Sequence, residues 1–201
     1  MSDTSSKILT IKITLLESQP KIWRRFQVAD DMTLGKLHDV IQIVMGWQDC
    51  HLHDFERGKK RYSKPDPEED SYGPPAINED QVSVGELLKR KKQKLMYIYD
   101  MGDYWEHALQ VENISEPESK QFYPNCIEGA FACPPEDCGG TWGYQNMLEA
   151  LADPKHEEHE TFVEWIGPDF DAEEFYLEEI NEVLEDFDNY KSGWDDFDGE
   201  Y

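Results

Sequence analysis

The sequence has no long hydrophobic run. A membrane-spanning helix needs about 20 consecutive apolar residues, and no stretch of the 201 residues approaches that length. The first residues, MSDTSSKILTIKITLL, also lack the basic region, apolar core and small-residue cleavage site of a secretory signal. We therefore expect a cytoplasmic protein.

Positive charge is scarce as well. Lysine and arginine number 19 against 44 aspartate and glutamate residues, which gives a formal net charge of −25. Residues 1–64 hold 11 cations against 8 anions, whereas residues 65–201 hold 8 against 36. This excess of negative charge opposes unselective binding to nucleic acid. The acidic C-terminal part suits a basic protein partner instead.

Ten of the nineteen cations are concentrated in two runs, at residues 57–64 and 89–94. Such runs are usually solvated loops and helix ends, where cations also suit the helix dipole. The alternative is a patch that contacts nucleic acid, as in an accessory protein.

Complete catalytic motifs are absent. The chain contains no G-x-S-x-G elbow, no dinucleotide-binding fingerprint and no nucleophilic cysteine with an obvious base. The glycines at 139, 140 and 143 precede a predicted helix but lack the lysine of a phosphate-binding loop. His156 and His159 are three residues apart, whereas an H-E-x-x-H zinc motif needs a spacing of four. No class of enzyme is indicated.

Alternating apolar and polar residues predict strands. Between Ile8 and Leu16, for example, every second residue is leucine or isoleucine. Turn signals at 18–20 and 100–103 join neighbouring runs into two hairpins. The strands are expected at residues 8–16, 22–28, 51–57, 94–100 and 104–111.

Helical spacing and capping residues predict the helices. Thr33 is a plausible N-cap for a helix that stops at Gly46. Ser83 with Glu86 is a capping box that opens a brief helix through Arg90. Pro154 would begin one later helix, and the capping box of Asp171 and Glu174 would open another. The C-terminal helices are expected at 141–152, 153–166 and 172–187, and the proline-rich residues 58–80 as a long loop.

Strands come first and helices last, which is the order of an α+β fold. We expect a mostly antiparallel sheet with one helix packed in its concavity and a C-terminal helical layer. Residues 1–190 would form one domain, with residues 191–201 as an acidic tail. Its parts would be a sheet-rich part at about 7–114, a connector at 123–144 and a helical part at 144–187.

The connector, YPNCIEGAFACPPEDCGGTWGY, holds three of the four cysteines, three prolines and four glycines. We expect a loop of defined shape here, because proline and glycine disfavour helix and strand. Cys126, Cys133 and Cys138 could bind zinc with His107 as the fourth ligand, although structural zinc sites usually present closely paired cysteines. Cys50, His51 or His53 are alternative fourth ligands. The alternative is that the cysteines are small buried residues.

Polar residues of the predicted strands suggest a pocket. His51 and His53 would share one strand face, but Phe55 breaks the H-x-H-x-D-H pattern of binuclear metallohydrolases. They could line a pocket, or they could simply pack half-buried under the helix. The candidate pocket residues are Arg24, His51, His53, Asp100, Asp103, Trp105 and His107.

The chain resembles the plasmid pRiA4b ORF-3-like family. The resemblance runs from Ile8 to about Leu184 and rests on PKIWRRFQV, MTLGKLHDVIQIVMGWQDCHLHDF, VSVGELL, YIYDMGDYWEH, the whole connector and LADPKHEEH. This chain reads MGDYWEH where the family tends to have FGDGWEH, and Tyr176 stands where an aspartate is common. The resemblance implies a compact α+β domain and no particular activity. Some relatives are labelled as passengers of mobile elements, which describes gene neighbourhood and implies no recombinase chemistry.

We expect a non-enzymatic binding or interaction module that uses the pocket. The first alternative is a metal-dependent enzyme acting on a small molecule or nucleotide, with zinc as the candidate cofactor. The second is a mobile-element-associated accessory protein that contacts nucleic acid through the basic runs.

Overall fold

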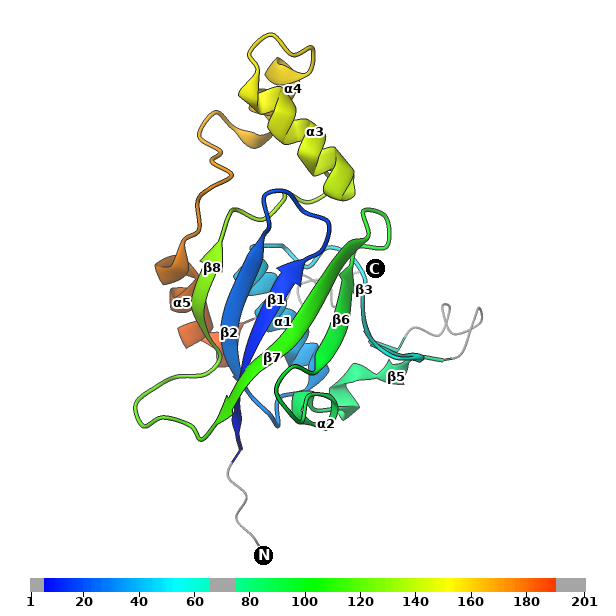
Figure 1. The fold of residues 1–201 in the computed structure, drawn as a ribbon, viewed down its shortest axis with the longest axis vertical. Coiled ribbons are helices and arrows are strands. Elements are labelled where there is room, and N and C mark those ends of the chain that lie inside the picture. The colour runs from blue at the N-terminus through cyan, green and yellow to red at the C-terminus, as the bar shows by residue number, and fades with distance from the viewer. Residues whose placement is uncertain (1–5, 66–74, 191–201) are drawn as a thin grey trace, which may run out of the picture.

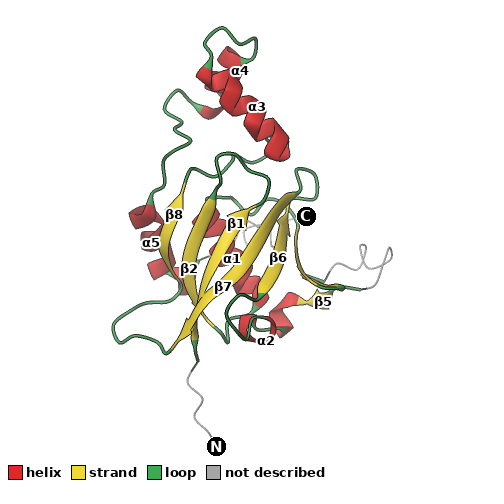
Figure 2. Cartoon of the chain, viewed as in Figure 1, coloured by secondary structure: helices red, strands yellow, loops and turns green. Residues whose placement is uncertain are grey.

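The computed structural model describes residues 6–65 and 75–190, and within them eight strands form one sheet (Figures 1 and 2). The strands are β1 (Ile8–Leu15), β2 (Trp23–Ala29), β3 (His53–Arg57), β4 (Lys60–Ser63), β5 (Ile77–Asn78), β6 (Lys94–Tyr99), β7 (Trp105–Ser115) and β8 (Asn125–Ala130).

The strands follow the order β5-β4-β3-β6-β7-β1-β2-β8. Every neighbouring pair is antiparallel except β4 and β5. The prediction of an α+β fold with a mostly antiparallel sheet is therefore confirmed. The two predicted hairpins, β1–β2 and β6–β7, lie side by side in the middle of the sheet because β1 pairs with β7.

Helix α1 (Leu34–Met45) packs against one face of the sheet, behind it in Figure 1. Thr33 caps its start by accepting a hydrogen bond from the backbone N–H of Lys36, and Gly46 ends it in the left-handed conformation at φ 90°. Both boundaries were predicted. Ten of its twelve residues are buried, so α1 forms the centre of the core.

The other α-helices are α2 (Val84–Leu87), α3 (Gly140–Ala152), α4 (His159–Ile166) and α5 (Leu177–Glu185). Short 3-10 turns lie at Glu79–Gln81 and Phe187–Asn189. Helices α3 and α4 lie together beyond one end of the sheet, whereas α5 lies beside β8 (Figure 2). No helix in the described ranges is both long and apolar enough to cross a bilayer.

Strand β8 lies at the edge of the sheet, and α5 covers its outer side. The backbone N–H of Cys126 donates to the Asn181 side-chain oxygen at 2.8 Å, and the Asn181 amide donates to the Cys126 carbonyl at 2.9 Å. The two bonds satisfy backbone groups that an edge strand would otherwise leave open.

Two predicted loops contain strands. The segment 58–80 was predicted to be a loop, but it contains β4 and β5, and its residues 66–74 lie outside the described part. The connector was predicted to be a loop, but its start is β8. The close packing explains the glycine at position 129 of this edge strand, because a Cβ there would lie 2.6 Å from the Phe175 ring and 2.8 Å from the Arg24 side chain.

Three helix boundaries were also predicted wrongly. The helix at Ser83 has the predicted capping box but ends at Leu87, not Arg90. Helix α4 begins at His159 because Asp153 accepts a hydrogen bond from the Lys155 N–H and forms a turn instead. Asp171 likewise bonds to the Glu173 N–H, so α5 begins at Leu177 rather than at 172. The predicted acidic tail lies outside the described residues, and the predicted domain division stays a prediction.

Candidate functional site

Arg24, on β2, is buried in the wall of the core. Its guanidinium donates to the carbonyls of Val44, Trp23 and Ala130 at 2.8–2.9 Å and lies 4.5 Å from the Phe175 ring centroid. Burial lowers the pKa of Arg24 below its usual value. The side chain therefore holds β2, α1 and β8 together, apart from the predicted pocket.

Trp105 and His107 lie on β7 and are completely buried. The His107 ring packs edge-on against Trp47, with ring centroids 5.2 Å apart, and near Tyr97. Its two nitrogens make no hydrogen bond of ordinary geometry with any described residue. Burial lowers the pKa of His107 to about 3, although the backbone carbonyls of Tyr97 and Trp105 favour its charged form slightly. His107 is a neutral core histidine.

His53 belongs to a buried polar network that we name the interior cluster: His38, Asp49, His53 and Glu79. The His53 ring stacks on His38 with a centroid separation of 3.5 Å and an interplanar angle of 5°. His53 Nε2 lies 2.9 Å from the Glu79 carboxylate, and His38 Nε2 lies 2.8 Å from that of Asp49.

The hydrogen bonds of the interior cluster close a ring. Gln42 donates to the Tyr97 hydroxyl, which lies 2.9 Å from His38 Nδ1, and the Asp49 N–H donates to the Gln42 side-chain oxygen. Burial, followed by the charge of His53, lowers the pKa of His38 to about 4. Neutral His38 then accepts from Tyr97 and donates to Asp49, which is the tautomer that this network requires.

The interior cluster has the residue types of a metal site but not the geometry. An imidazole ligand directs its lone pair in the plane of its ring. Rings that are parallel and 3.5 Å apart cannot both point at one ion. The interior cluster is therefore a structural support for α1 and β3. Sequence reasoning missed His38, although its place on the apolar face of the helix, one residue after Leu37, signals burial.

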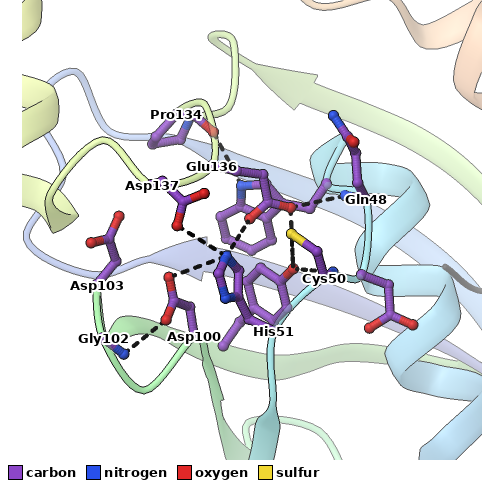
Figure 3. Close-up of polar contacts among 12 residues, drawn as sticks. Gln48, Cys50, His51, Asp100, Gly102, Asp103, Pro134, Glu136 and Asp137 are labelled. Carbon is purple, nitrogen blue, oxygen red and sulfur yellow. Dashed lines mark hydrogen bonds and ion pairs between the residues drawn. The ribbon is translucent and has the colours of Figure 1, made fainter. Parts of the chain in front are cut away.

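Two further groups share His51: one adds Cys50 and Glu136, and the other adds Asp100 and Asp137. We name the five residues together the surface cluster. His51 Nε2 lies 3.2 Å from Asp137 Oδ1, 3.7 Å from Asp100 Oδ2 and 3.7 Å from Glu136 Oε2. Figure 3 shows the imidazole between the three carboxylates, with Asp103 close by. Of the predicted pocket residues, the structure thus brings together His51, Asp100 and Asp103. Sequence reasoning missed Glu136 and Asp137.

Three separate turns present the surface cluster. Asp49, Asp100 and Asp137 each adopt φ of 53–57°, a left-handed conformation that aspartate tolerates better than most residues. Asp100 Oδ1 accepts from the Gly102 N–H, and Asp103 accepts from the Gly139 N–H at 3.0 Å. The second bond ties the turn at 100–103 to the start of α3. Gly140 permits this contact, since a Cβ there would lie 2.6 Å from the Asp103 carbonyl oxygen.

Glu136 is held by one of its two oxygens. Its Oε1 accepts from the Gln48 N–H at 2.9 Å and from the Tyr99 hydroxyl at 3.1 Å. Its Oε2 is buried and has no hydrogen-bond donor within the described ranges, and His51 Nε2 is in the same condition. The surface cluster therefore presents acceptor atoms to one another without a proton donor of good geometry between them.

The cysteines are protonated thiols at neutral pH, not the thiolates that act as nucleophiles. Burial raises the pKa of Cys126 to about 11 and that of Cys138 to about 12, and it raises that of Cys133 further. Burial and then the Glu136 charge raise the pKa of Cys50. Three groups of described residues have the composition of a metal site, and none of them contains Cys126, Cys133, Cys138 or His107.

A groove lined partly by apolar side chains adjoins the surface cluster. It has a volume of about 560 Å³, shares Cys50, Glu136 and Asp137 with the cluster and continues over Trp165 and Phe170. Exposed apolar side chains also follow His51 and Asp100 in the chain and stand at the start of α3: Leu52, Met101, Tyr104 and Trp142, of which Trp142 is 81% exposed.

The two basic runs lie at the other end of the sheet. Strand β6 runs from Lys94 to Tyr99, and the surface cluster begins at the next residue, Asp100. Strand β3 is antiparallel to β6, which places Arg57 at the Lys94 end. Arg57 donates to the Leu87 carbonyl and Arg61 lies 3.4 Å from Asp54, so part of the first run is engaged within the fold.

Comparison with known proteins identifies the family. The model of the plasmid pRiA4b ORF-3-like protein family matches residues 7–179. The chain belongs to this family. It is similar to the uncharacterized protein y4hQ of Sinorhizobium fredii, with 36% identity over 183 residues, 90% of this chain and 92% of the relative.

A solved structure is also similar to this chain. The crystal structure of the protein of unknown function MM3350 from Methanosarcina mazei Go1 matches with a TM-score of 0.78 and 36% identity. The match covers 88% of this chain and 98% of that one. The predicted family is confirmed, and the names of these relatives indicate no specific activity.

Proposed function

We propose that this protein is a non-enzymatic binding module that recognises a basic protein segment at the surface cluster. The observation that carries the proposal is the convergence of three carboxylates on His51 with no lysine or arginine among them. A cationic side chain placed there would supply the missing hydrogen-bond donors and the missing positive charge.

The charge around the site supports a basic partner. Between Lys94 and Lys155 the only cation in the sequence is Lys120, so the turns that build the surface cluster contain none. The protein as a whole has a net charge of −25, which attracts a basic partner from a distance and speeds its association.

The exposed apolar side chains near the surface cluster favour a protein segment over a small cation as the ligand. Tryptophan, tyrosine and methionine are enriched at protein interfaces, and exposed apolar groups gathered around a polar centre are typical of a docking surface. Met101, Tyr104 and Trp142 are exposed apolar side chains close to the carboxylates in the chain, and the groove that Glu136 and Asp137 share with Trp165 adds apolar surface.

The test is binding of a labelled peptide to the full chain, followed by fluorescence anisotropy. The probe is a 12-residue peptide in which arginine alternates with leucine, and its analogue with glutamate in place of arginine is the negative control. We expect the triple variant D100N/E136Q/D137N to bind the basic probe at least tenfold more weakly than the parent, and added salt to weaken parent binding.

The matched control removes the same three charges elsewhere. Glu178, Glu182 and Glu185 are exposed on α5, and the variant E178Q/E182Q/E185Q should bind within about threefold of the parent, because distant exposed charges are largely screened. An equal loss in both triple variants would show that binding follows total charge, and the proposal would fail. Lack of binding by the parent would also overturn it.

A further inference from the structure

We infer that the surface cluster is a metal site for a zinc-type divalent ion, with His51 Nε2, Asp100 Oδ2 and Asp137 Oδ1 as ligands. This inference does not depend on the proposed binding of a basic segment. It concerns only whether these three atoms can hold an ion in common.

The spacing of the three atoms fits one ion. A tetrahedral zinc ion with bonds of about 2.0–2.2 Å holds its ligand atoms about 3.3–3.6 Å from one another. From His51 Nε2 the Asp137 and Asp100 oxygens lie at 3.2 and 3.7 Å, and the ligand atoms of the three residues all lie within 4.8 Å of one another. Glu136 belongs to a separate group with Cys50 and His51.

The bonding state of these atoms points the same way. Buried polar atoms are nearly always hydrogen-bonded, yet His51 Nε2 is buried without a hydrogen-bond partner among the described residues. Asp100, whose side chain is only 8% exposed, uses Oδ1 for the Gly102 N–H and turns Oδ2 toward the imidazole. A cation between these atoms would satisfy them together and offset the repulsion between the carboxylates.

The interactions around the ligands already fix their orientation. Asp100 is held through Oδ1 by the Gly102 N–H, which leaves Oδ2 free to coordinate. Hydrogen bonds to the remaining oxygen of a ligating carboxylate are typical of the second layer around protein metal sites. The surface cluster is therefore largely preorganised before any ion arrives.

The ligand types select the metal. One imidazole and two carboxylates suit zinc, manganese or iron, whereas calcium requires six to eight oxygen ligands. Of these divalent ions, zinc binds nitrogen-containing sites more tightly than manganese. The thiol of Cys50 also lies within 4.8 Å of ligand atoms of His51 and Glu136, which further favours zinc.

A bound ion would join three distant parts of the chain. His51 precedes β3, Asp100 follows β6, and Asp137 lies before α3. The ion would fasten the sheet to the segment that leads into the α3–α4 pair.

The test is isothermal titration of the full-length chain, stripped with chelator and dialysed, with zinc chloride alone. We expect one equivalent to bind. The variants H51Q and D137N should each lower the affinity at least tenfold, and calcium chloride should bind more weakly than zinc. Asp137 is 72% exposed, so D137N tests the site without disturbing the fold. The control H156Q/E160Q, on and before α4, should bind as the parent does.

Cobalt(II) absorption distinguishes this site from the cysteine site predicted from sequence. Thiolate ligands give cobalt an intense near-ultraviolet charge-transfer band, which the C126S/C133S/C138S variant would abolish if those cysteines were ligands. We expect that variant to bind zinc as the parent does. Loss of binding in it, or unchanged affinity in both H51Q and D137N, would overturn the inference.

Discussion

His51 and His53 are two residues apart, yet they belong to opposite kinds of environment. His53 lies in the interior cluster, stacked on His38 and paired with Glu79. His51 faces three carboxylates at the protein surface, and no described residue gives its Nε2 a well-formed hydrogen bond. Both clusters contain buried carboxylate oxygens without a donor among the described residues, but only in the interior cluster does each imidazole have a carboxylate of its own.

The difference shows that pairing, not residue type, separates a structural cluster from a candidate site. In the interior cluster each imidazole has its own carboxylate, and α1, β3 and β6 hold them rigidly. In the surface cluster one imidazole is shared by three carboxylates from two turns. An excess of acceptors over donors is a reason to look for a ligand.

The largest effect should come from breaking the interior cluster. Substituting His38→Leu keeps the side-chain volume but leaves the Asp49 carboxylate and the Tyr97 hydroxyl without this partner. Leaving a buried hydrogen-bonding group without its partner costs about 1–3 kcal/mol, and more for a charged group. We expect that loss in the free energy of unfolding, measured by guanidinium denaturation with tryptophan fluorescence.

The matched change in the surface cluster is His51→Leu. We expect it to alter the metal-free protein by less than about 1 kcal/mol, because surface substitutions without a lost bond are usually small. Equal losses in the two variants would refute the contrast between the clusters.

The second effect is a dependence of stability on pH that comes from His107. This histidine lies in the core, and neither of its ring nitrogens pairs with a carboxylate among the described residues. Its pKa is about 3 in the folded protein and about 6.5 in the unfolded chain, so the unfolded chain binds the extra proton between these values. Stability therefore falls as pH falls below about 6, by about 1.4 kcal/mol per pH unit from this residue.

Substituting His107→Leu should remove that slope between pH 5.5 and 4. Both proteins should keep a constant difference in stability from pH 7 to 8, where His107 is neutral in either state. Denaturation curves across this range measure the slope. A variant with the parent's slope would show that His107 does not carry the effect.

The smallest effect should be competition at the surface cluster. If a divalent ion and a cationic side chain use the same carboxylates, each lowers the affinity for the other by the same factor. The carboxylates of Asp100, Glu136 and Asp137 keep a net negative charge beside a divalent ion, so we expect zinc to weaken binding of the basic peptide severalfold rather than abolish it. Anisotropy titrations with and without zinc measure this factor. Binding that is tighter with zinc would contradict the competition.

Local patterns predicted the central fold well. The alternation in β1, β2, β6 and β7 reflects one buried face, and Thr33 and Gly46 mark α1 by local capping chemistry. Strand β8 was missed because its pairing with the distant strand β2, which depends on tertiary structure, overrides the proline and glycine signals. Strand β4 pairs with its neighbour β3 across the turn at Gly58, a local hairpin that the prediction of one long loop overlooked.

The candidate site was only partly predictable. His51, Asp100 and Asp103 could be grouped because they follow or precede paired strands. Arg24, Trp105 and His107 share the strand alternation of core residues, and that pattern correctly indicates burial rather than a pocket. Glu136 and Asp137 reach His51 only through the path of the segment between β8 and α3, which no local pattern specifies.

The amide of Asn181 imitates a short piece of strand where it bonds to Cys126. Helix α5 comes more than forty residues after β8 in the chain. During synthesis the contact between Asn181 and Cys126 is therefore among the last to form. Until α5 has left the ribosome, the outer side of β8 is open to any other extended chain. We therefore expect chains truncated before residue 177 to associate through this edge. In the full chain Asn181 protects the edge from such association.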